Sequence, residues 1–176
     1  MSTRTVLHEA DIARALTRIS HEILESNRGP AGLVILGIPR RGVPLAARIG
    51  SLLAEISGTV VPVGALDVTM YRDDLHRNPT RAPQPTEIPE GGIDGKVVVL
   101  VDDVLFSGRS IRAALDALQD IGRPAAVRLA TLVDRGHREL PIRPDFVGKN
   151  LPSARDERVN VRLREVDGVE EVTIGS

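Results

Sequence analysis

Residues 97–110 read Val97-Val-Val-Leu-Val-Asp-Asp-Val-Leu-Phe-Ser-Gly-Arg-Ser110, an apolar run that ends in two acids and continues into a small polar turn. The aliphatic part predicts a buried strand over residues 96–101. The residues after the turn have the spacing of a helix over 107–121, which Gly122 and Pro124 end. A strand, a glycine turn and a helix in succession are typical of parallel sheets whose connections are helices.

The same alternation continues on both sides of this stretch. The expected elements are a helix over 8–28, a strand over 32–38, a helix over 42–56, and strands over 59–69 and 125–133. In the first helix Ile12, Leu16, Ile19 and Ile23 form one apolar stripe. The pattern predicts the α/β class, with a mostly parallel central sheet and helices on both faces. Ligands of such sheets bind beyond the carboxyl ends of the strands.

The chain is expected to form a single domain over residues 1–176. Residues 71–95 are rich in proline and glycine and predict a flexible loop at the site. Beyond residue 134 turns and charges dominate, and short strands are expected over 145–149 and 158–166. We expect residues 134–166 to form a small C-terminal hood.

The composition excludes several classes of protein. The chain has 176 residues, no cysteine and a formal net charge of −1. Disulfides, thiolate metal sites and a cysteine nucleophile are therefore excluded, and no sequence-wide basic field indicates DNA binding. Neither a signal peptide nor an apolar run long enough for a membrane span is recognisable, so we expect a soluble, cytoplasmic protein.

The two acids and the turn after them have complementary chemistry. The free N–H groups at a helix start, with the hydroxyls of Ser107 and Ser110 and the charge of Arg109, suit a phosphate. Asp102 and Asp103 can instead accept hydrogen bonds from vicinal hydroxyls, so the stretch suits a sugar 5-phosphate. The alternative is an N-capping serine beside two solvated aspartates.

A second glycine loop, Gly37-Ile-Pro-Arg-Arg-Gly42, also joins a strand to a helix. It lacks the Lys-Ser/Thr of a Walker loop, since Val43 and Pro44 follow. Adjacent arginines at the carboxyl end of a strand suit a polyanion. The alternative is a turn with two surface arginines.

The stretch over 97–110 resembles the signature of the type I phosphoribosyltransferases, which bind 5-phosphoribosyl diphosphate (PRPP) with Mg²⁺. The resemblance implies catalytic roles for Asp102, Asp103 and Arg41, and contacts of the two acids with the ribose hydroxyls and with Mg²⁺. It places the leaving diphosphate on Arg40 and Arg41, in a loop that often has a cis peptide. The residues implied in nucleotide binding after the acids are Val104, Leu105, Phe106, Ser107, Gly108, Arg109 and Ser110. Phe106 departs from the purine-salvage pattern, which has an aspartate there.

Two further segments, residues 67–75 and 132–150, resemble the bacterial pyrimidine operon regulators called PyrR. That family consists of uracil phosphoribosyltransferases that also bind messenger RNA. The resemblance extends from about residue 15 to 168 and implies a uracil site at Val133, Asp134 and Arg135. The implied RNA-binding residues are Thr17, Arg18, His21, His137, Arg138, Arg143 and Lys149. Residues 123–164 hold ten Lys/Arg against five Asp/Glu, which independently favours a polyanionic partner.

The sequence therefore predicts an enzyme that makes UMP and diphosphate from uracil and PRPP, in a homodimer or larger homo-oligomer. It also predicts that UMP or UTP promotes binding to the leader mRNA of the pyrimidine operon. Two alternatives stay open at this point: a salvage enzyme without an RNA role, and an RNA-binding regulator with vestigial catalysis.

Overall fold

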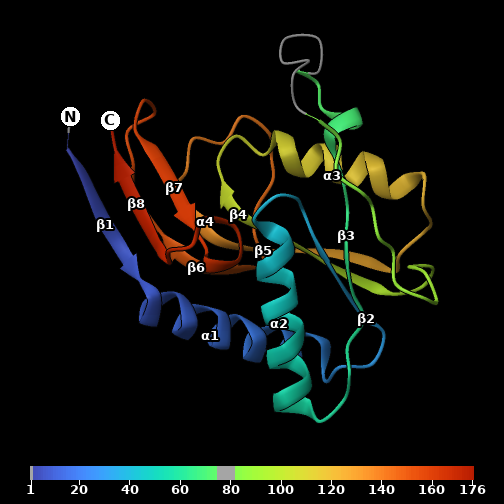
Figure 1. The fold of residues 1–176 in the computed structure, drawn as a ribbon. Coiled ribbons are helices and arrows are strands. Elements are labelled where there is room, and N and C mark those ends of the chain that lie inside the picture. Colours follow the sequence, from blue (N-terminus) through green and yellow to red (C-terminus); the bar gives the residue numbers. More distant parts are fainter. Residues whose placement is uncertain (1, 75–81) are drawn as a thin grey trace.

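The computed structural model describes residues 2–74 and 82–176, and its main sheet has five parallel strands in the order β3-β2-β4-β5-β6 (Figure 1). The strands are β2 (Leu33–Gly37), β3 (Val63–Ala65), β4 (Val97–Leu105), β5 (Ala126–Asp134) and β6 (Phe146–Asn150). The predicted α/β class with a mostly parallel sheet is confirmed. β4 is the central strand and continues through both acids, because Asp102 is still paired with Thr131 of β5.

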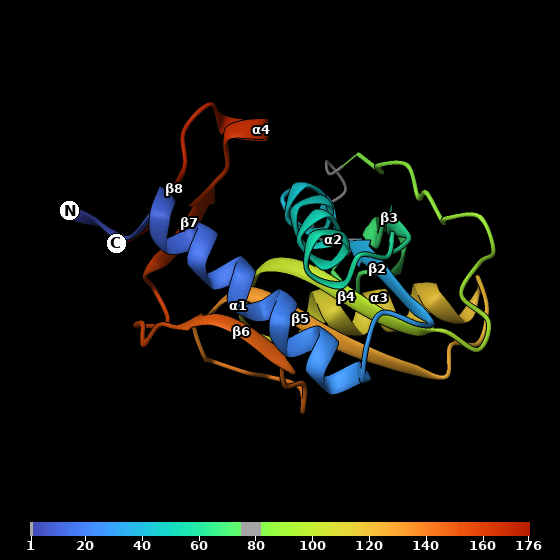
Figure 2. The same cartoon turned by 90° about the horizontal axis from the view of Figure 1, so that it is seen from below.

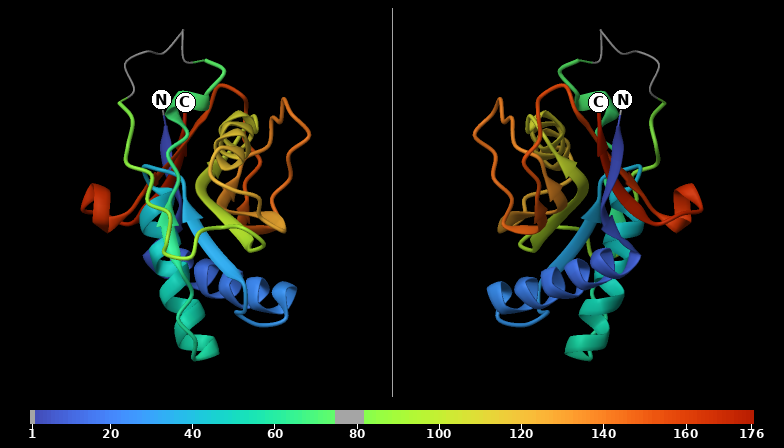
Figure 3. Two further views of the ribbon diagram at one scale, coloured as in Figure 1. Left: turned by 90° about the vertical axis from the view of Figure 1, so that its right-hand side faces the viewer. Right: turned by 90° about the vertical axis from the view of Figure 1, so that its left-hand side faces the viewer.

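Helices cover both faces of this sheet (Figures 2 and 3). They are α1 (Glu9–Asn27) and α2 (Gly42–Ser57) on one face and α3 (Arg109–Gln119) on the other. The stripe predicted in α1 is buried, with Ile12, Leu16, Ile19 and Ile23 each at most 3% exposed. Each face of the sheet therefore has its own apolar core, so a ligand can bind only at the ends of the strands.

A second sheet is built from both ends of the chain. β1 (Thr3–His8), β8 (Glu171–Gly175) and β7 (Arg158–Arg162) pair antiparallel in the order β1-β8-β7, which brings the two termini side by side (Figure 1). The strands within the expected hood of residues 134–166 divide between the two sheets. Residues 146–150 pair with β5 in the main sheet, whereas the second sheet takes strands from residues 3–8 and 171–175.

Two expected strands are shorter in the structure. The strand expected over 59–69 is reduced to β3, followed by the short 3-10 helix η1 (Thr69–Tyr71). Val60 is 85% exposed and precedes β3 in the chain, at a place where the chain is not yet paired with β2. The strand expected over 158–166 ends at Arg162, and the four-residue helix α4 (Arg164–Asp167) follows it.

The loop expected over 71–95 is only partly described, because residues 75–81 lie outside the described residues. Its later part returns to the sheet, where Glu87 and Ala65 exchange backbone hydrogen bonds of 2.8 and 2.9 Å. Within residues 2–74 and 82–176, no helix is both long and apolar enough to cross a bilayer.

Glycines allow the start of α2 to touch the central strand. A Cβ on Gly42 would lie 2.4 Å from the carbonyl oxygen of Val101, and one on Gly37 would lie 2.4 Å from that of Gly42. Both are distances that a side chain cannot adopt without moving the backbone. The loop between these glycines is therefore held directly against the end of β4, beside the two acids.

Candidate active site

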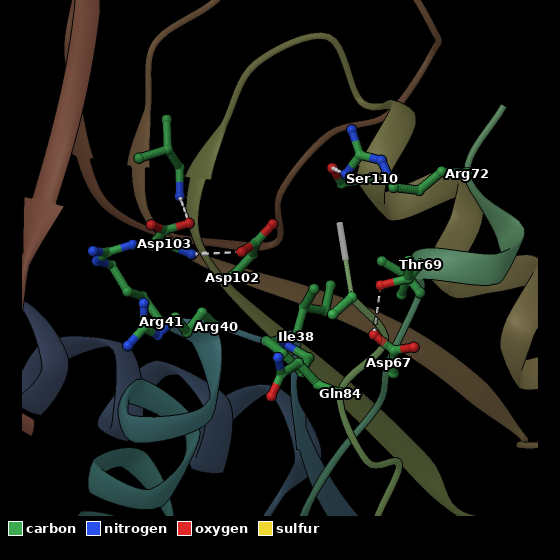
Figure 4. Close-up of a pocket in the computed structure, with 14 residues that line it drawn as sticks. Ile38, Arg40, Arg41, Asp67, Thr69, Arg72, Gln84, Asp102, Asp103 and Ser110 are labelled. Carbon is green, nitrogen blue, oxygen red and sulfur yellow. Dashed lines mark hydrogen bonds between the residues drawn. The ribbon is translucent and has the colours of Figure 1, made fainter. Parts of the chain in front are cut away.

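The arginine loop over 37–42, the loop expected over 71–95 and the acid pair meet at one cavity of about 480 Å³. It lies beyond the carboxyl ends of β2 and β4 (Figure 4). This is the edge at which parallel sheets bind ligands. Residues from the loop after β2, from the segment after β3, from β4 and from α3 contribute to its wall. Its polar lining residues include Arg40, Arg41, Asp67, Thr69, Arg72, Gln84, Asp102, Asp103 and Ser110.

The acid pair lies in the cavity wall and is fixed by the backbone of β4. The Asp103 N–H donates to Oδ1 of Asp102 at 2.9 Å, and the Val104 N–H donates to Oδ1 of Asp103 at 2.8 Å. Burial raises the pKa of the Asp102 carboxyl well above its ordinary value, and the charge of Asp103 and a hydrogen bond with it raise it further. Donors such as sugar hydroxyls would favour the ionised form of this carboxyl.

The turn after the acids lines a second cavity of about 230 Å³ that shares Asp102 with the first. Gly108 caps α3 with φ of +94°, a conformation that strains other residues, and a Cβ there would lie 3.1 Å from Ile142. The first N–H groups of a helix have no acceptor within it, so they are available for an anion. The residues that the sequence assigned to nucleotide binding, Val104 to Ser110, all line this cavity.

Arg72 is a cationic residue of the site that the sequence analysis did not single out. It reaches both cavities from the segment after η1, donates to the Ser110 hydroxyl at 3.3 Å and pairs with Asp74 at 3.0 Å. It lies within the stretch 67–75 that carries the resemblance, but nothing in its spacing distinguishes it from its neighbours. Arg109 pairs outward instead, with Asp73 at 2.6 Å and Glu139 at 2.9 Å.

The arginine loop approaches the acids from the other side. The peptide between Pro39 and Arg40 is cis, as the resemblance led us to expect. Arg40 is exposed at the mouth of the cavity. Arg41 forms a two-pronged pair with Asp167 of α4, at 2.7 and 3.1 Å. The hydrogen bonds that Arg41 donates to Asp167 raise the pKa of Arg41, so this guanidinium stays charged.

The three residues expected to bind uracil follow one another at the carboxyl end of β5, next to β4 in the sheet. Val133 is fully buried, and Asp134 pairs with Arg138 at 2.8 Å. The guanidinium of Arg135 lies 4.3 Å from the centre of the Phe106 ring. None of the three lines the cavities of 480 and 230 Å³, but they lie directly behind the turn that does.

The residues expected to bind RNA fall into two groups. Thr17, Arg18 and His21 of α1 are exposed beside β6, and Arg18 donates to the carbonyl oxygens of Val147 and Gly148 at 2.8 and 2.6 Å. Lys149 is exposed on β6 itself. We call Thr17, Arg18, His21 and Lys149 the α1–β6 surface; Figure 2 shows the two elements side by side.

The other three residues lie in the loop between β5 and β6. Arg143 is exposed. Arg138 is held internally, since it donates to the carbonyl oxygens of Phe106 and Ile142 at 2.8 and 2.7 Å. His137 has φ of +67°, and its Nε2 lies 2.6 Å from the carbonyl oxygen of Ser153. Arg138 thus supports the turn that follows the acids, and His137 is anchored to the loop before β7.

The chain is similar to known proteins over nearly its whole length. A family model described as a phosphoribosyl transferase domain matches residues 2–162. The bifunctional protein PyrR of Leifsonia xyli is 73% identical over 179 residues, covering 99% of this chain and 97% of that protein. The bifunctional protein PyrR of Streptomyces coelicolor is 63% identical and covers 98% and 90% of the two chains.

Solved structures support the fold alone. A hypoxanthine phosphoribosyltransferase of Trypanosoma cruzi superposes with a TM-score of 0.75 at 17% identity, covering 98% of this chain and 94% of that one. A hypoxanthine phosphoribosyltransferase of Staphylococcus aureus gives a TM-score of 0.69 at 22% identity, covering 96% and 90%.

Proposed function

Because this chain belongs to the phosphoribosyl transferase domain family and, within it, to the PyrR proteins, we propose that it transfers the phosphoribosyl group of PRPP to N1 of uracil. The products are UMP and diphosphate. The observation that carries the proposal is that Asp102 borders both cavities. One cavity is lined by the turn at residues 107–110 and the other by the arginine loop at residues 37–42. A sugar held by the acids reaches both with its two ends.

The chain supplies binding and orientation. Asp102 and Asp103 accept hydrogen bonds from the ribose hydroxyls, and the turn at Ser107–Ser110 donates N–H groups to the 5-phosphate. The bond between the anomeric carbon and the diphosphate oxygen breaks, and its electron pair leaves with diphosphate. N1 of uracil then bonds to that carbon and loses its proton to solvent. The acid pair faces the positive charge that develops on the sugar, so no side-chain nucleophile is needed.

Mg²⁺ bound to PRPP fits the donor set of this cavity. Mg²⁺ in such sites takes one or two carboxylates together with substrate oxygens. Asp102 and Asp103 supply two carboxylates, and no group of three or more metal-binding side chains occurs within residues 2–74 and 82–176. The ion would neutralise charge on the leaving diphosphate, with Asp102 and Asp103 as its contacts on the protein.

Uracil is placed at the end of β5, at Val133–Arg135. The register that pairs Leu105 with Asp134 supports this placement, because it sets these residues beside the turn that holds the sugar phosphate. The Val133 side chain is buried, so a base at this place would meet the end of the strand and not that side chain.

A base-specificity assay tests the reaction. Purified protein is supplied with PRPP, Mg²⁺ and one base at a time: uracil, adenine, guanine, hypoxanthine or orotate. We expect nucleotide and diphosphate with uracil only. Equal turnover of a purine would overturn the uracil assignment, and no turnover with any base would leave the regulator without catalysis.

The second activity is binding of pyrimidine-operon leader mRNA, strengthened by UMP or UTP. Exposed cations on the α1–β6 surface and at Arg143 support it, since phosphates attract such groups. Arg143 and Lys149 are the cleanest positions to test, because neither side chain has a hydrogen bond or ion pair within the described part of the chain.

Leader-RNA retention is measured with and without UMP for Arg143→Ala, Lys149→Ala and the control Arg4→Ala, whose arginine is exposed on β1. We expect the first two variants to bind several-fold more weakly and the control to bind like wild type. Wild-type affinity in both would remove this face from the RNA site.

A further inference from the structure

Helix α4 is linked to the body of the protein by several ion pairs. It has four residues, none of them buried, and it projects from the second sheet (Figure 3). Glu165 and the nearby Glu170 both pair with Arg48 of α2, at 2.5 and 2.6 Å. Arg164 pairs with Glu9 of α1 at 2.7 Å. These ion pairs connect α4 to α1 and α2, and the buried Leu163 at its start anchors it to the apolar core.

One residue of α4 points toward the active site. Asp167 accepts hydrogen bonds from Nε and Nη2 of Arg41 on its two carboxylate oxygens, so one edge of the guanidinium is engaged. Its Oδ2 also accepts the Leu163 N–H at 2.8 Å, which fixes the carboxylate. Side-chain exposures of 30% for Arg41 and 18% for Asp167 shield the pair partly from water.

Arg41 stands between two hollows. It lines the 480 Å³ cavity with the acid pair, and it also lines an adjoining hollow of about 460 Å³ on the other side. That hollow is bordered by Asp103, Asn160, Arg162 and Asp167. An arginine side chain has several rotatable bonds and would otherwise move between the two. The bidentate pair leaves it one orientation, with its remaining N–H groups free to meet an anion.

We propose that Asp167 is a positioning residue, which orients Arg41 for the diphosphate group of PRPP. The inference rests on the proposed function and adds a residue of the C-terminal part to the diphosphate site. When the charge of Asp167 is lost, the Arg41 guanidinium is no longer held in one orientation, although the side chain remains. The affinity for diphosphate therefore falls.

The test is Asp167→Asn, which keeps the side-chain shape and an acceptor for the Leu163 N–H. Calorimetric titration with Mg-diphosphate should give an approximately tenfold higher Kd, about 1.4 kcal/mol, and KM for PRPP should rise equally. KM for uracil should not change, since a merely structural defect would raise both. Glu165→Gln is the matched control, because it lies on the same helix and Arg48 keeps Glu170; wild-type affinity is expected.

A mutant cycle separates positioning from general electrostatics. In an Arg41→Ala background, Asp167→Asn should change the diphosphate Kd no further. Additive losses, equal losses in Glu165→Gln, or wild-type or tighter binding by Asp167→Asn would each overturn the inference. Failure of the proposed function looks different, because wild-type protein would then form no UMP from uracil and PRPP.

Discussion

Asp102 is the residue at which binding and stability conflict. Its carboxyl lies in a partly buried cavity wall and adjoins Asp103, and both conditions disfavour its ionised form. An acid at this place costs stability unless a ligand donates to it. A sugar with free hydroxyls is such a ligand, which explains why the acid is tolerated at the end of a buried strand.

Asp102→Asn should therefore stabilise the empty protein. The unfolded carboxyl loses its proton near the ordinary value of 3.8, and the folded one only at higher pH. Between these values the unfolded state binds fewer protons, so wild-type stability falls as pH rises through that interval. The asparagine avoids this fall, and at pH 7 we expect a gain of about 1 kcal/mol, or about 2–4 °C in Tm.

Thermal unfolding at pH 7 and at pH 3 measures this effect. The gain should disappear at pH 3, where the wild-type carboxyl is protonated in both states. Asp116→Asn, at an exposed position of α3, serves as the control and should leave Tm unchanged at both pH values. A variant less stable than wild type at pH 7 would contradict the account.

At the scale of the elements, the contact between α2 and β4 sets the site. The start of α2 lies against β4 only because Gly42 has no side chain. Gly42→Ala should push the arginine loop away from the acids and cost about 1–3 kcal/mol by overpacking. Urea denaturation measures the loss of stability.

Ser51→Ala is the control, because Ser51 is exposed in the middle of α2. It should change stability by less than about 0.5 kcal/mol. Wild-type stability of Gly42→Ala would show that the contact is not needed.

Local patterns predicted the elements of the main sheet well. The α1 stripe, the apolar run of β4 and the glycine turn before α3 are each recognised from a few residues, because their periodicity and turn chemistry are local. β1 and β8 were missed. Each is five or six residues long and pairs with the other across nearly the whole chain, from Thr3 to Gly175. No local signal reports such a pairing.

The parts of the site that are close together in the sequence were also predictable, and the distant ones were not. Asp102, Asp103 and the turn follow one strand and were found together, as was the arginine loop. Asp167 was not, because it meets Arg41 only after the second sheet has formed, 126 positions along the chain. Arg138 also differs from its expectation, since an arginine in a basic segment gives no sign that its donors are used by the carbonyl oxygens of Phe106 and Ile142.

Across the whole molecule, near-neutral charge conceals a division between acidic and basic parts. Residues 123–164 carry an excess of cations, and residues 165–176 carry four acids and no base. Part of the acidic end is used internally, since Glu165, Asp167 and Glu170 all pair with arginines of the loop and helix after β2. Among the described residues, Lys149 of the α1–β6 surface and Arg143 have no such partner and remain for a polyanion.

RNA binding should therefore weaken as salt rises. A plot of log K against log salt is expected to be linear, with a slope that measures the number of phosphate contacts. Lys149→Ala should make the slope less steep by about 0.7, one contact to a single strand, and Arg4→Ala should leave it unchanged. A salt-independent affinity would contradict an electrostatic RNA surface.

The most direct test of the pocket itself is PRPP turnover by the double variant Asp102→Asn, Asp103→Asn with saturating uracil and Mg²⁺. The charges are removed while the side-chain shapes and the backbone hydrogen bonds of β4 are kept. We expect kcat/KM for PRPP to fall by at least about a hundredfold, with a folded protein by thermal unfolding. Turnover equal to wild type would show that the acid pair does not hold the sugar.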